Sequence, residues 1–376
     1  LALVALGVPM NWSPYVPVTT LEGATQVLPG GPVAALEFIK NLGTNGGGFF
    51  NVNGAHPYEC PSPIANLIEM LAIAVLPASL TYTLGKMLNR PRLGWMLFAV
   101  MTVLFVGGLI VCGAAEQTGN PQIAALGVTG GNFEGKETRF GIGGSVLAAI
   151  TTSNGATGSY NSMYDSYTPL GGGVLLVNML LGEIVYGGLG TGVYSIVMIT
   201  LVGLFLSGLM IGRTPEFVGK MIGPPEIKLV MLYTLATPAA VLLLTAIAVV
   251  TEGGLAGLTT NNGSHGFSEI IYAYASATAN NGQNMAGLSA NTPFYNITTA
   301  IAMMIGRFGL AIPALALAGH LATQGRRPTT LGTLPTDTVQ FAVVLLGTAL
   351  IVGALSFFPA LALGPIVEHF QMIEKR

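Results

Sequence analysis

Three short segments rich in glycine and asparagine carry the residues with the clearest chemical potential. They read Gly43-Thr44-Asn45-Gly46-Gly47-Gly48, Thr152-Ser153-Asn154-Gly155-Ala156 and Ala279-Asn280-Asn281-Gly282-Gln283. Glycine allows a chain to present its carbonyl oxygens without a clash from Cβ. Carbonyl oxygens arranged in a ring can replace the hydration shell of a monovalent cation such as potassium. The segments contain no carboxylate, which argues against a divalent-cation site at these positions.

The elements around each segment repeat in the same order. A short apolar stretch precedes each tip, and a Ser/Thr-Pro pair follows it. The apolar stretches are Val33–Leu42, Ile142–Thr151 and Phe267–Thr278, and the pairs are Ser62-Pro63, Thr168-Pro169 and Thr292-Pro293. Ser or Thr before Pro is typical of a helix N-cap. We therefore predict three units of a span, a re-entrant half-helix, a Gly/Asn tip and a second, capped span.

The composition is that of a membrane protein. Only 8% of the 376 residues are charged, 51% are apolar and the mean hydropathy is +0.66. An ordinary soluble domain is about 25% charged. A soluble enzyme, a disordered chain and a nucleic-acid-binding protein are excluded, and two cysteines are too few for a disulfide framework. We predict an all-α polytopic protein whose surroundings are the lipid bilayer.

Five stretches are long and apolar enough to cross a bilayer, which requires about 20 residues. They are Ile64–Met87, Leu93–Ala115, Lys228–Val250, Asn296–Ala322 and Thr338–Leu363. The opening Leu1–Met10 is interpreted as the outer half of another span, and its abrupt start suggests that the chain begins inside a longer protein.

Charge sets the orientation of the spans. Eight Lys and Arg residues but only three acids lie in the loops after three of the spans, which makes these loops cytoplasmic. Gly171 is then outside and Arg213 inside, so the apolar stretch between them crosses an odd number of times. One crossing with an interruption fits best. We place the interruption at Gly187-Gly188-Leu189-Gly190-Thr191-Gly192, where glycine weakens the helix.

Three charged residues fall inside the predicted spans: Glu69, Glu183 and Arg307. A charge at the bilayer centre usually faces a cavity or a partner. Arg307 would lie below the Asn281-Gly282 tip, and we hypothesise that it repels a cation from an axial exit. The alternative is a structural ion pair with Glu183 or Glu69. For the two glutamates, packing or pairing is the favoured interpretation.

Other motifs in the sequence say less about function. The segment Gly130–Glu137 nearly fits a phosphate-binding loop, but Glu137 replaces the required Ser or Thr, and the predicted topology places the segment outside. We expect no nucleotide site on this chain. The four histidines show no metal-ligand spacing, and no nucleophile–base set that would indicate an intramembrane enzyme is visible.

Several longer motifs resemble the potassium-binding subunit of the Kdp-type potassium-transporting ATPases. They are Thr44–Asn51, Gly135–Gly141, Gly212–Glu216, His265–Glu269, Ala286–Asn291 and Gly332–Thr336. The resemblance extends over essentially the whole chain. It implies a superfamily of potassium transporters in which four span–pore-helix–span repeats surround one pore.

By this resemblance the chain contains three of the four repeats. Residues 1–92 correspond to the second repeat (pore loop 33–48, span 64–87), and residues 93–225 to the third (span 93–115, pore loop 142–158, broken span 171–212). Residues 226–327 correspond to the fourth (span 228–250, pore loop 267–283, span 296–322), and residues 328–376 to a final span and tail. The first repeat and its filter strand are missing, so we expect that this chain alone does not transport.

The resemblance also implies a role for individual residues. Potassium at the selectivity filter would be held by Thr44, Asn45, Gly46, Gly47, Thr152, Ser153, Asn154, Gly155, Asn280, Asn281 and Gly282. Asn154 departs modestly from the family pattern. The broken span, with Gly187, Gly188, Gly190 and Gly192, resembles an intramembrane loop beneath the filter that gates the ion path, and Glu183 and Arg307 are further candidates for that path.

The implied function is potassium uptake across the bacterial inner membrane by a complex. This chain would select the ion without being catalytic, a P-type ATPase subunit would hydrolyse ATP, and two small subunits would complete the assembly. The alternative is a potassium channel or cation symporter subunit of the same superfamily, which works with a cytosolic nucleotide-binding ring. The extended motifs favour the pump subunit.

Overall fold

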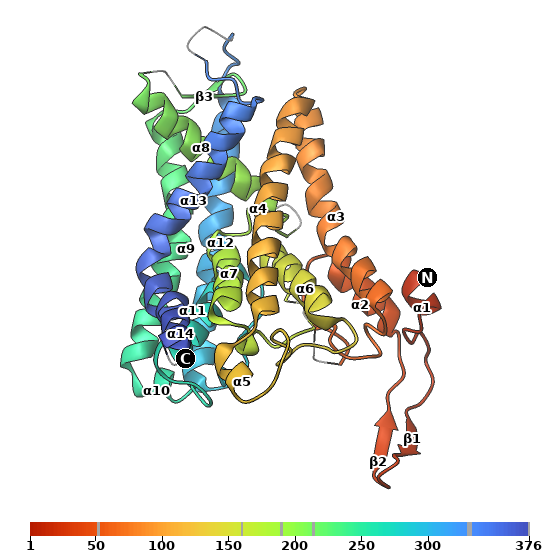
Figure 1. Ribbon diagram of the computed structural model, residues 1–376. Helices are drawn as coiled ribbons and strands as arrows, with labels where there is room; N and C mark the ends of the chain where they lie inside the picture. Colours follow the sequence, from red (N-terminus) through yellow and green to blue (C-terminus); the bar gives the residue numbers. More distant parts are fainter. Residues whose placement is uncertain (51–52, 159–160, 189–190, 213–214, 329–332, 375–376) are drawn as a thin grey trace.

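A computed structural model describes residues 1–50, 53–158, 161–188, 191–212, 215–328 and 333–374. Among these residues, six helical segments are long and apolar enough to cross a membrane, which confirms the prediction of an all-α polytopic membrane protein. Their helices stand side by side as a bundle (Figure 1). They are α3 (Pro63–Met87), α4 (Pro91–Thr118), α8 (Thr191–Met210), α9 (Pro224–Val250), α12 (Pro293–Thr323) and α13 (Val339–Leu361).

The remaining elements are short. The half-helices are α2 (Val33–Leu42), α6 (Gly141–Gly155), α7 (Pro169–Leu180) and α11 (Gly263–Ala279). The shortest helical elements are α1 (Ala2–Ala5), α5 (Pro121–Ala125), η1 (Tyr164–Ser166), α10 (Glu252–Leu255), the π-helical turn η2 (Ala362–Ile366) and α14 (Val367–Glu374). Two antiparallel hairpins pair β1 (Val16–Thr19) with β2 (Thr25–Leu28) and β3 (Glu216–Phe217) with β4 (Lys220–Met221). At the predicted half-span Leu1–Met10 the helix ends at Ala5, earlier than predicted.

The three predicted N-caps are confirmed. The side chains of Ser62, Thr168 and Thr292 each accept a hydrogen bond from the backbone N–H three residues later, and each is followed by proline. These bonds satisfy donors that a helix start would otherwise leave without partners. Each tip is therefore followed by a firmly started helix.

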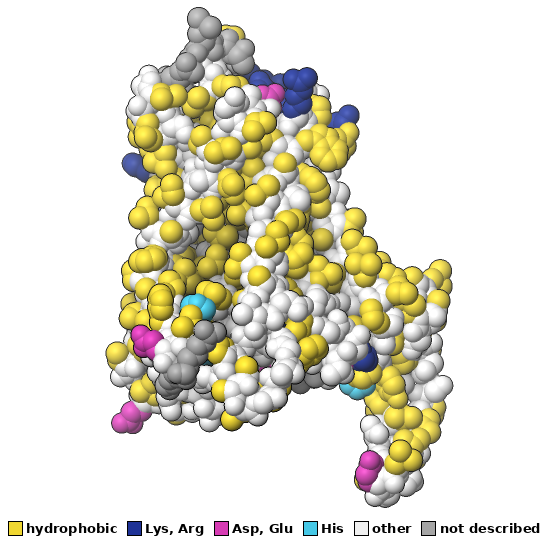
Figure 2. Space-filling view, in the orientation of Figure 1, with side chains coloured by type: hydrophobic (Ala, Val, Ile, Leu, Met, Phe, Trp, Pro, Cys, Tyr) yellow, Lys and Arg dark blue, Asp and Glu magenta, His cyan; other side chains and the backbone are white. Residues whose placement is uncertain are grey.

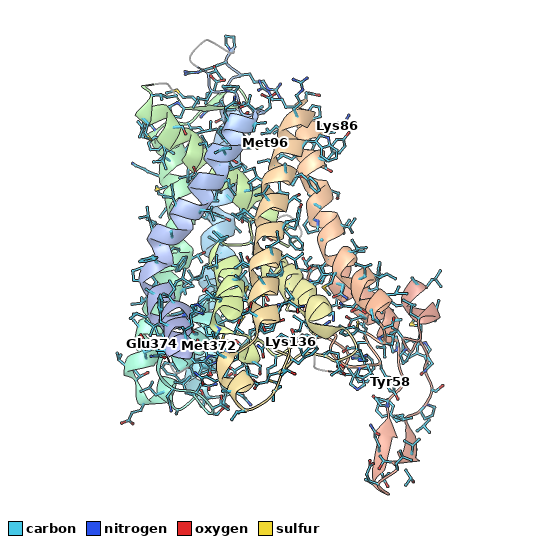
Figure 3. The ribbon with its side chains drawn as sticks, in the orientation of Figure 1. Tyr58, Lys86, Met96, Lys136, Met372 and Glu374 are labelled. Carbon is cyan, nitrogen blue, oxygen red and sulfur yellow. The ribbon has the colours of Figure 1, made fainter. Side chains whose placement is uncertain are left out.

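The two ends of the bundle differ in charge. Lys and Arg side chains gather at the end that holds β3, beside one acidic side chain, and the other visible Asp and Glu side chains and the His side chains lie toward the opposite end (Figure 2). Lys86 lies at the basic end and Lys136 near the other (Figure 3). By the positive-inside rule the basic end is cytoplasmic. The half-helices α2, α6 and α11 lie in the outer half of the molecule (Figure 1).

The broken span differs from the prediction in its bounds. Helix α7 ends at Leu180 and α8 begins at Thr191, so the interruption starts several residues before Gly187. Gly182 and Glu183 adopt left-handed backbone conformations with φ of 73° and 60°. A non-glycine residue adopts this conformation at an energetic cost, and a helix cannot continue through it. The helix is therefore already broken at Gly182-Glu183, ahead of the predicted glycines.

Gly306 allows α12 to contact the end of the half-helix α11. A Cβ atom at Gly306 would lie 1.7 Å from the carbonyl oxygen of Thr278. We therefore expect Gly306→Ala to destabilise the protein by about 1–3 kcal/mol, the usual effect of overpacking. The measurement is thermal unfolding of the purified protein in detergent. Gly319→Ala is the matched control, because Gly319 lies on the same helix and a Cβ there would meet no atom within 4 Å. Equal melting temperatures for the two variants would contradict this packing.

Candidate ion-binding site

The three tips share one backbone conformation. Each half-helix is followed by a residue in the left-handed region: Thr44 (φ 51°), Ala156 (φ 51°) or Asn280 (φ 54°). Two residues later comes a glycine that also has positive φ: Gly46 (74°), Gly158 (65°) or Gly282 (92°). Glycine adopts positive φ without strain, which explains its recurrence at this position. The three tips are thus structural equivalents.

The tips also meet one another. A Cβ at Gly46 would lie 2.1 Å from the carbonyl oxygen of Thr157, so the first and second tips are in contact. The N–H of Gly158 donates to Asn281 Oδ1 (3.2 Å), and Asn281 Nδ2 donates to the carbonyl oxygen of Thr152 (3.0 Å). Asn281 therefore joins the second and third tips. These contacts make the tips one site and not three separate surface loops.

The second tip lies further along the chain than predicted. Residues Thr152–Gly155 form the last turn of α6, and the non-helical segment begins at Ala156 and includes Thr157 and Gly158. The side chains of Thr152, Ser153 and Asn154 accordingly bond to carbonyls of their own helix. The helix therefore continues through the predicted tip residues as far as Gly155. Sequence reasoning missed Thr157 and Gly158, although Gly158 carries the same glycine signal as the other tips.

The half-helices point their C-terminal ends at this site. Leu42, Gly155 and Ala279 are the last residues of α2, α6 and α11, and the tips follow directly. The last carbonyls of a helix have no partner within it, and a helix C-terminus carries a partial negative charge of about half an electron. Three such ends favour a cation between them.

Burial differs among the predicted filter residues. Thr152, Ser153, Asn154 and Asn281 are almost completely buried, and Thr44 is 7% exposed. In contrast, Asn45, Gly47 and Gly282 are exposed, and Gly46 and Asn280 are half-buried. The second tip is therefore the most deeply buried of the three, and part of the first tip is exposed.

Polar side chains outside the tips hold them in place. Glu59 Oε1 accepts from the N–H groups of Phe49 (2.5 Å) and Phe50 (3.3 Å), which fixes the turn after the first tip. Asn178 of α7 donates to Ser153 Oγ (3.0 Å), and Tyr272 donates to Gln283 Oε1 (2.9 Å). No sequence motif singles out Glu59, Asn178 or Gln283 as residues of the site. A lone asparagine within the apolar α7 was the one available signal.

The break between α7 and α8 lies next to the tips. A Cβ at Gly188 would lie 3.2 Å from Thr44 Oγ1, and a Cβ at Gly155 would lie 3.8 Å from the Tyr186 carbonyl oxygen. Glu183 is buried in the same break and is 9% exposed. Gly187 and Gly192 pack tightly, since a Cβ at Gly192 would lie 2.8 Å from the Gly187 nitrogen. The predicted residue Gly190 lies outside the described residues.

Arg307 lies on α12, on the cytoplasmic side of the third tip. Asn280 Nδ2 donates to the Met303 carbonyl oxygen (3.3 Å), and Arg307 is one turn further along the helix. Its side chain is exposed. Among the described residues it forms no ion pair within 4.0 Å with Glu183 or Glu69, although its charge acts electrostatically on Glu183.

The segment that resembles a phosphate-binding loop has a structural role. Lys136 Nζ lies 2.6 Å from Glu116 Oε2, both side chains are fully buried, and the ammonium lies 4.0 Å from the centre of the Tyr167 ring. Glu116 also accepts from Asn132 Nδ2 (2.8 Å) and from the Thr168 N–H (2.9 Å). The amine is therefore engaged with a carboxylate. Glu116 lies in the last turn of α4, which runs past the predicted limit at Ala115.

Arg139 links the outer loops of two neighbouring units. Its guanidinium donates to the carbonyl oxygens of Cys60 (2.6 Å) and Ala55 (3.3 Å). It also donates to Glu137 Oε2 (3.1 Å), and this hydrogen bond lowers the pKa of Glu137. The start of α6 is thereby tied to the loop that follows the first tip.

Comparisons with known proteins agree with this architecture. The family described as "Potassium-transporting ATPase A subunit" matches residues 1–370. A protein from Mesorhizobium japonicum named "Potassium-transporting ATPase potassium-binding subunit" is 53% identical over 373 residues, which cover 99% of this chain and 66% of the relative. Proteins of the same name from Rhizobium rhizogenes (54% identical, 99% and 66%) and Solibacter usitatus (53%, 98% and 65%) are similar. The chain thus spans just under two thirds of the length of these relatives.

Proposed function

This chain belongs to the potassium-transporting ATPase A subunit family, and on that premise we propose that it binds potassium at its three converging tips. The ion would be taken from the outer side of the bacterial inner membrane and passed on for uptake. The chemistry of ATP would belong to another chain, a P-type ATPase catalytic subunit, with two small subunits in the same complex. This chain would be non-catalytic.

One observation carries the proposal: the tips contact one another through Gly46, Thr157, Gly158 and Asn281. Surface loops that merely connect helices have no reason to meet at the ends of three half-helices. Their glycines have positive φ, which is typical of a backbone that presents carbonyl oxygens to a ligand. A ring of carbonyl oxygens suits potassium because it replaces the water molecules that the ion loses.

The potassium ligands that we propose are the predicted filter residues of the first and third tips, with Thr157 and Gly158 added at the second. The carbonyls of Thr152–Gly155 remain candidates because they end a helix that points at the site. The partial negative charges of the three helix ends would stabilise the bound cation without a carboxylate. A carboxylate at the site would hold the ion too tightly for release.

The path beyond the site would pass the break between α7 and α8. Non-helical backbone at membrane depth persists where it is buried or lines a path. Gly188 lies against Thr44 of the first tip, and Glu183 is the buried acid of this break. We propose that the break gates the exit of potassium. The exposed guanidinium of Arg307 would oppose an axial exit and favour a lateral one toward the ATPase subunit.

The test is Asn281→Ala in the full-length subunit, purified with its ATPase partner. We expect the potassium concentration for half-maximal ATP hydrolysis to rise about 10-fold, because a buried hydrogen-bonded bridge between two tips is lost. Asn296→Ala is the matched control, since Asn296 is exposed on α12. Unchanged potassium dependence in Asn281→Ala would overturn the assignment.

The same preparation separates the pump from the channel or symporter alternative. Potassium uptake into proteoliposomes should require ATP hydrolysis if the chain serves a pump. Uptake that proceeds at full rate with a non-hydrolysable nucleotide would favour the alternative.

A further inference from the structure

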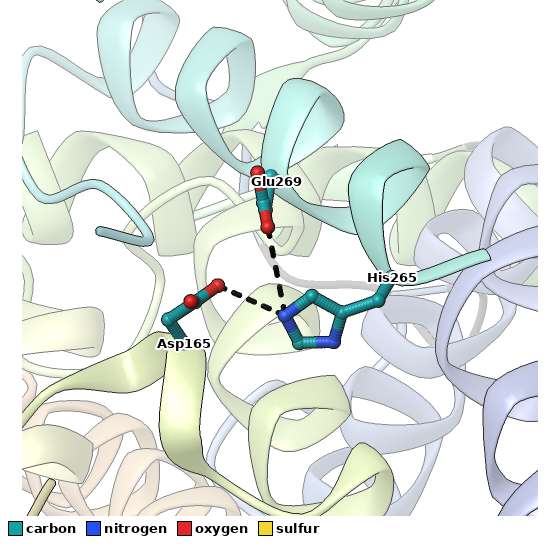
Figure 4. Close-up of side chains that lie close together, drawn as sticks. All are labelled: Asp165, His265 and Glu269. Carbon is teal, nitrogen blue, oxygen red and sulfur yellow. Dashed lines mark hydrogen bonds and ion pairs between the residues drawn. The ribbon is translucent and has the colours of Figure 1, made fainter. Parts of the chain in front are cut away.

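A cluster of metal-ligating side chains lies on the outer face, apart from the three tips. Asp165 of η1 and His265 and Glu269 of α11 each offer one ligand atom, and these atoms lie within 4.8 Å of one another. Figure 4 shows the two carboxylates directed at the same nitrogen of His265. We propose that this cluster is a Zn²⁺ site, with His265 Nε2 and one oxygen each of Asp165 and Glu269 as ligands.

The distances between the ligand atoms fit such a site. His265 Nε2 lies 2.9 Å from Asp165 Oδ1 and 3.8 Å from Glu269 Oε1. Ligands in a tetrahedral zinc site stand about 2.0–2.2 Å from the metal, which separates neighbouring ligand atoms by about 3.3 Å. Small side-chain adjustments would bring the three atoms to that separation. One imidazole and two carboxylates form a donor set that zinc accepts, with the fourth position left for water.

A second set of residues orients the ligands. His265 Nδ1 lies 2.6 Å from Glu368 Oε1, so the imidazole can donate its Nδ1 proton to Glu368 while Nε2 faces the carboxylates. Such a carboxylate–histidine pair is the usual support of a metal-ligating histidine. Asn261 Nδ2 donates to Glu269 Oε1 (3.0 Å) and to Asp165 Oδ2 (3.4 Å). Each of the three ligands is therefore held by a neighbour.

One buried carboxylate oxygen of the cluster lacks a hydrogen-bond partner. The Glu269 side chain is 0% exposed, and among the described residues its Oε2 has no hydrogen-bond partner. Nor does any Lys or Arg that the structure describes form an ion pair with Asp165, Glu269 or Glu368. His265 supplies at most one positive charge to the three acids around it, so a divalent cation would neutralise the buried Glu269 carboxylate more completely.

The cluster also lies beside a cavity that gives a metal ion room and a route of entry. A cavity of about 450 Å³ is lined by Asp165, His265, Asn261 and Glu368, among others, and Gln371 and Met372 of α14 also line it. Water ligands and an incoming ion can therefore reach the cluster. The site would cross-link η1 and α11 directly and α14 through Glu368, which joins segments of the chain about 100 residues apart.

The competing occupant of Nε2 is a proton. Burial by itself lowers the pKa of His265, but the hydrogen bonds to Asp165 and Glu368 outweigh it and raise that pKa to about 10. Without metal, an imidazolium would bridge the carboxylates. A metal must displace this proton, so binding should release protons.

The experiment measures Zn²⁺ binding directly, without reference to transport. The full-length subunit in its purified complex is stripped with chelator, and Zn²⁺ is titrated by calorimetry and by competition with a chromogenic chelator. We expect one Zn²⁺ site that is lost in His265→Gln and Asp165→Asn, and an increase in melting temperature on Zn²⁺ addition to the unmodified protein. Glu368→Gln should weaken the affinity about 10- to 100-fold.

His369→Gln is the matched control, because His369 neighbours Glu368 on α14 but contributes no ligand. The control should bind Zn²⁺ as the unmodified protein does. Zn²⁺ affinity and melting temperature that are equal in the unmodified protein, His265→Gln and Asp165→Asn would overturn the proposal and leave the imidazolium bridge as the occupant. Because the readout is metal binding, failure here would leave the potassium assignment untouched.

Discussion

Replacement of Gly46 by alanine should weaken potassium binding by about 100-fold, which we expect to be the largest single effect on the ion site. The new Cβ would lie 2.1 Å from the Thr157 carbonyl oxygen, so one of the two tips must move by about an ångström. Displacements of that size at a preorganised site commonly change its performance about 100-fold. Alanine is also strained at φ +74°. The measurement is potassium-dependent ATP hydrolysis by the full-length complex, together with direct binding of ⁴²K⁺ or rubidium.

Gly127→Ala is the control for Gly46→Ala. Gly127 also has positive φ (89°), but a Cβ there would meet no atom within 4 Å, so it reports the backbone strain without the clash. Complex assembly and melting temperature should be recorded for both variants. If Gly46→Ala assembles and responds to potassium as Gly127→Ala does, the first tip does not take part in the ion site.

Removal of the Lys136 ammonium should destabilise the protein even more than the overpacking expected at Gly306. Lys136→Met leaves the Glu116 carboxylate fully buried without its cation, and loss of one partner of a buried pair costs about 3–5 kcal/mol. The melting temperature in detergent should fall by roughly 10 °C. The loss should be structural, because the ammonium contacts Glu116, the Glu134 carbonyl oxygen and the Tyr167 ring, none of which belongs to a tip.

A double-mutant cycle checks the origin of that loss. In Lys136→Met with Glu116→Gln, both charges are gone, and we expect at least half of the lost stability to return. Lys228→Met removes an exposed lysine and should leave the melting temperature unchanged. Equal melting temperatures for Lys136→Met and the Lys228→Met control would show that the Lys136–Glu116 pair contributes nothing to stability.

Local signals predicted much of this fold. The caps at Ser62, Thr168 and Thr292 were visible because a cap depends on two adjacent residue types and the helix that follows. The spanning helices were visible because a bilayer demands long apolar runs. The break before α8 was expected from its glycines, but its start was misplaced. The left-handed conformation of Glu183 depends on tertiary packing, which a sequence pattern does not reveal.

The ion site was predicted less completely for the same reason. An Asn-Gly pair at Asn154-Gly155 suggested the second tip, yet the helix runs through it because packing against its neighbours favours one more turn. The outer cluster was invisible in sequence. His265 and Glu269 share a helix face, but Asp165 and Glu368 lie about 100 residues away on either side. Only the assembled repeats bring these charges together.

The shortness of α7 has a consequence for how the protein enters the membrane. Its 12 residues rise about 18 Å, well below the roughly 30 Å of hydrocarbon. Such a segment cannot remain in lipid alone with its C-terminal carbonyls unbonded. During biosynthesis it must be integrated together with the helices that receive it. For this segment, partition from the translocon and tertiary folding are therefore a single event.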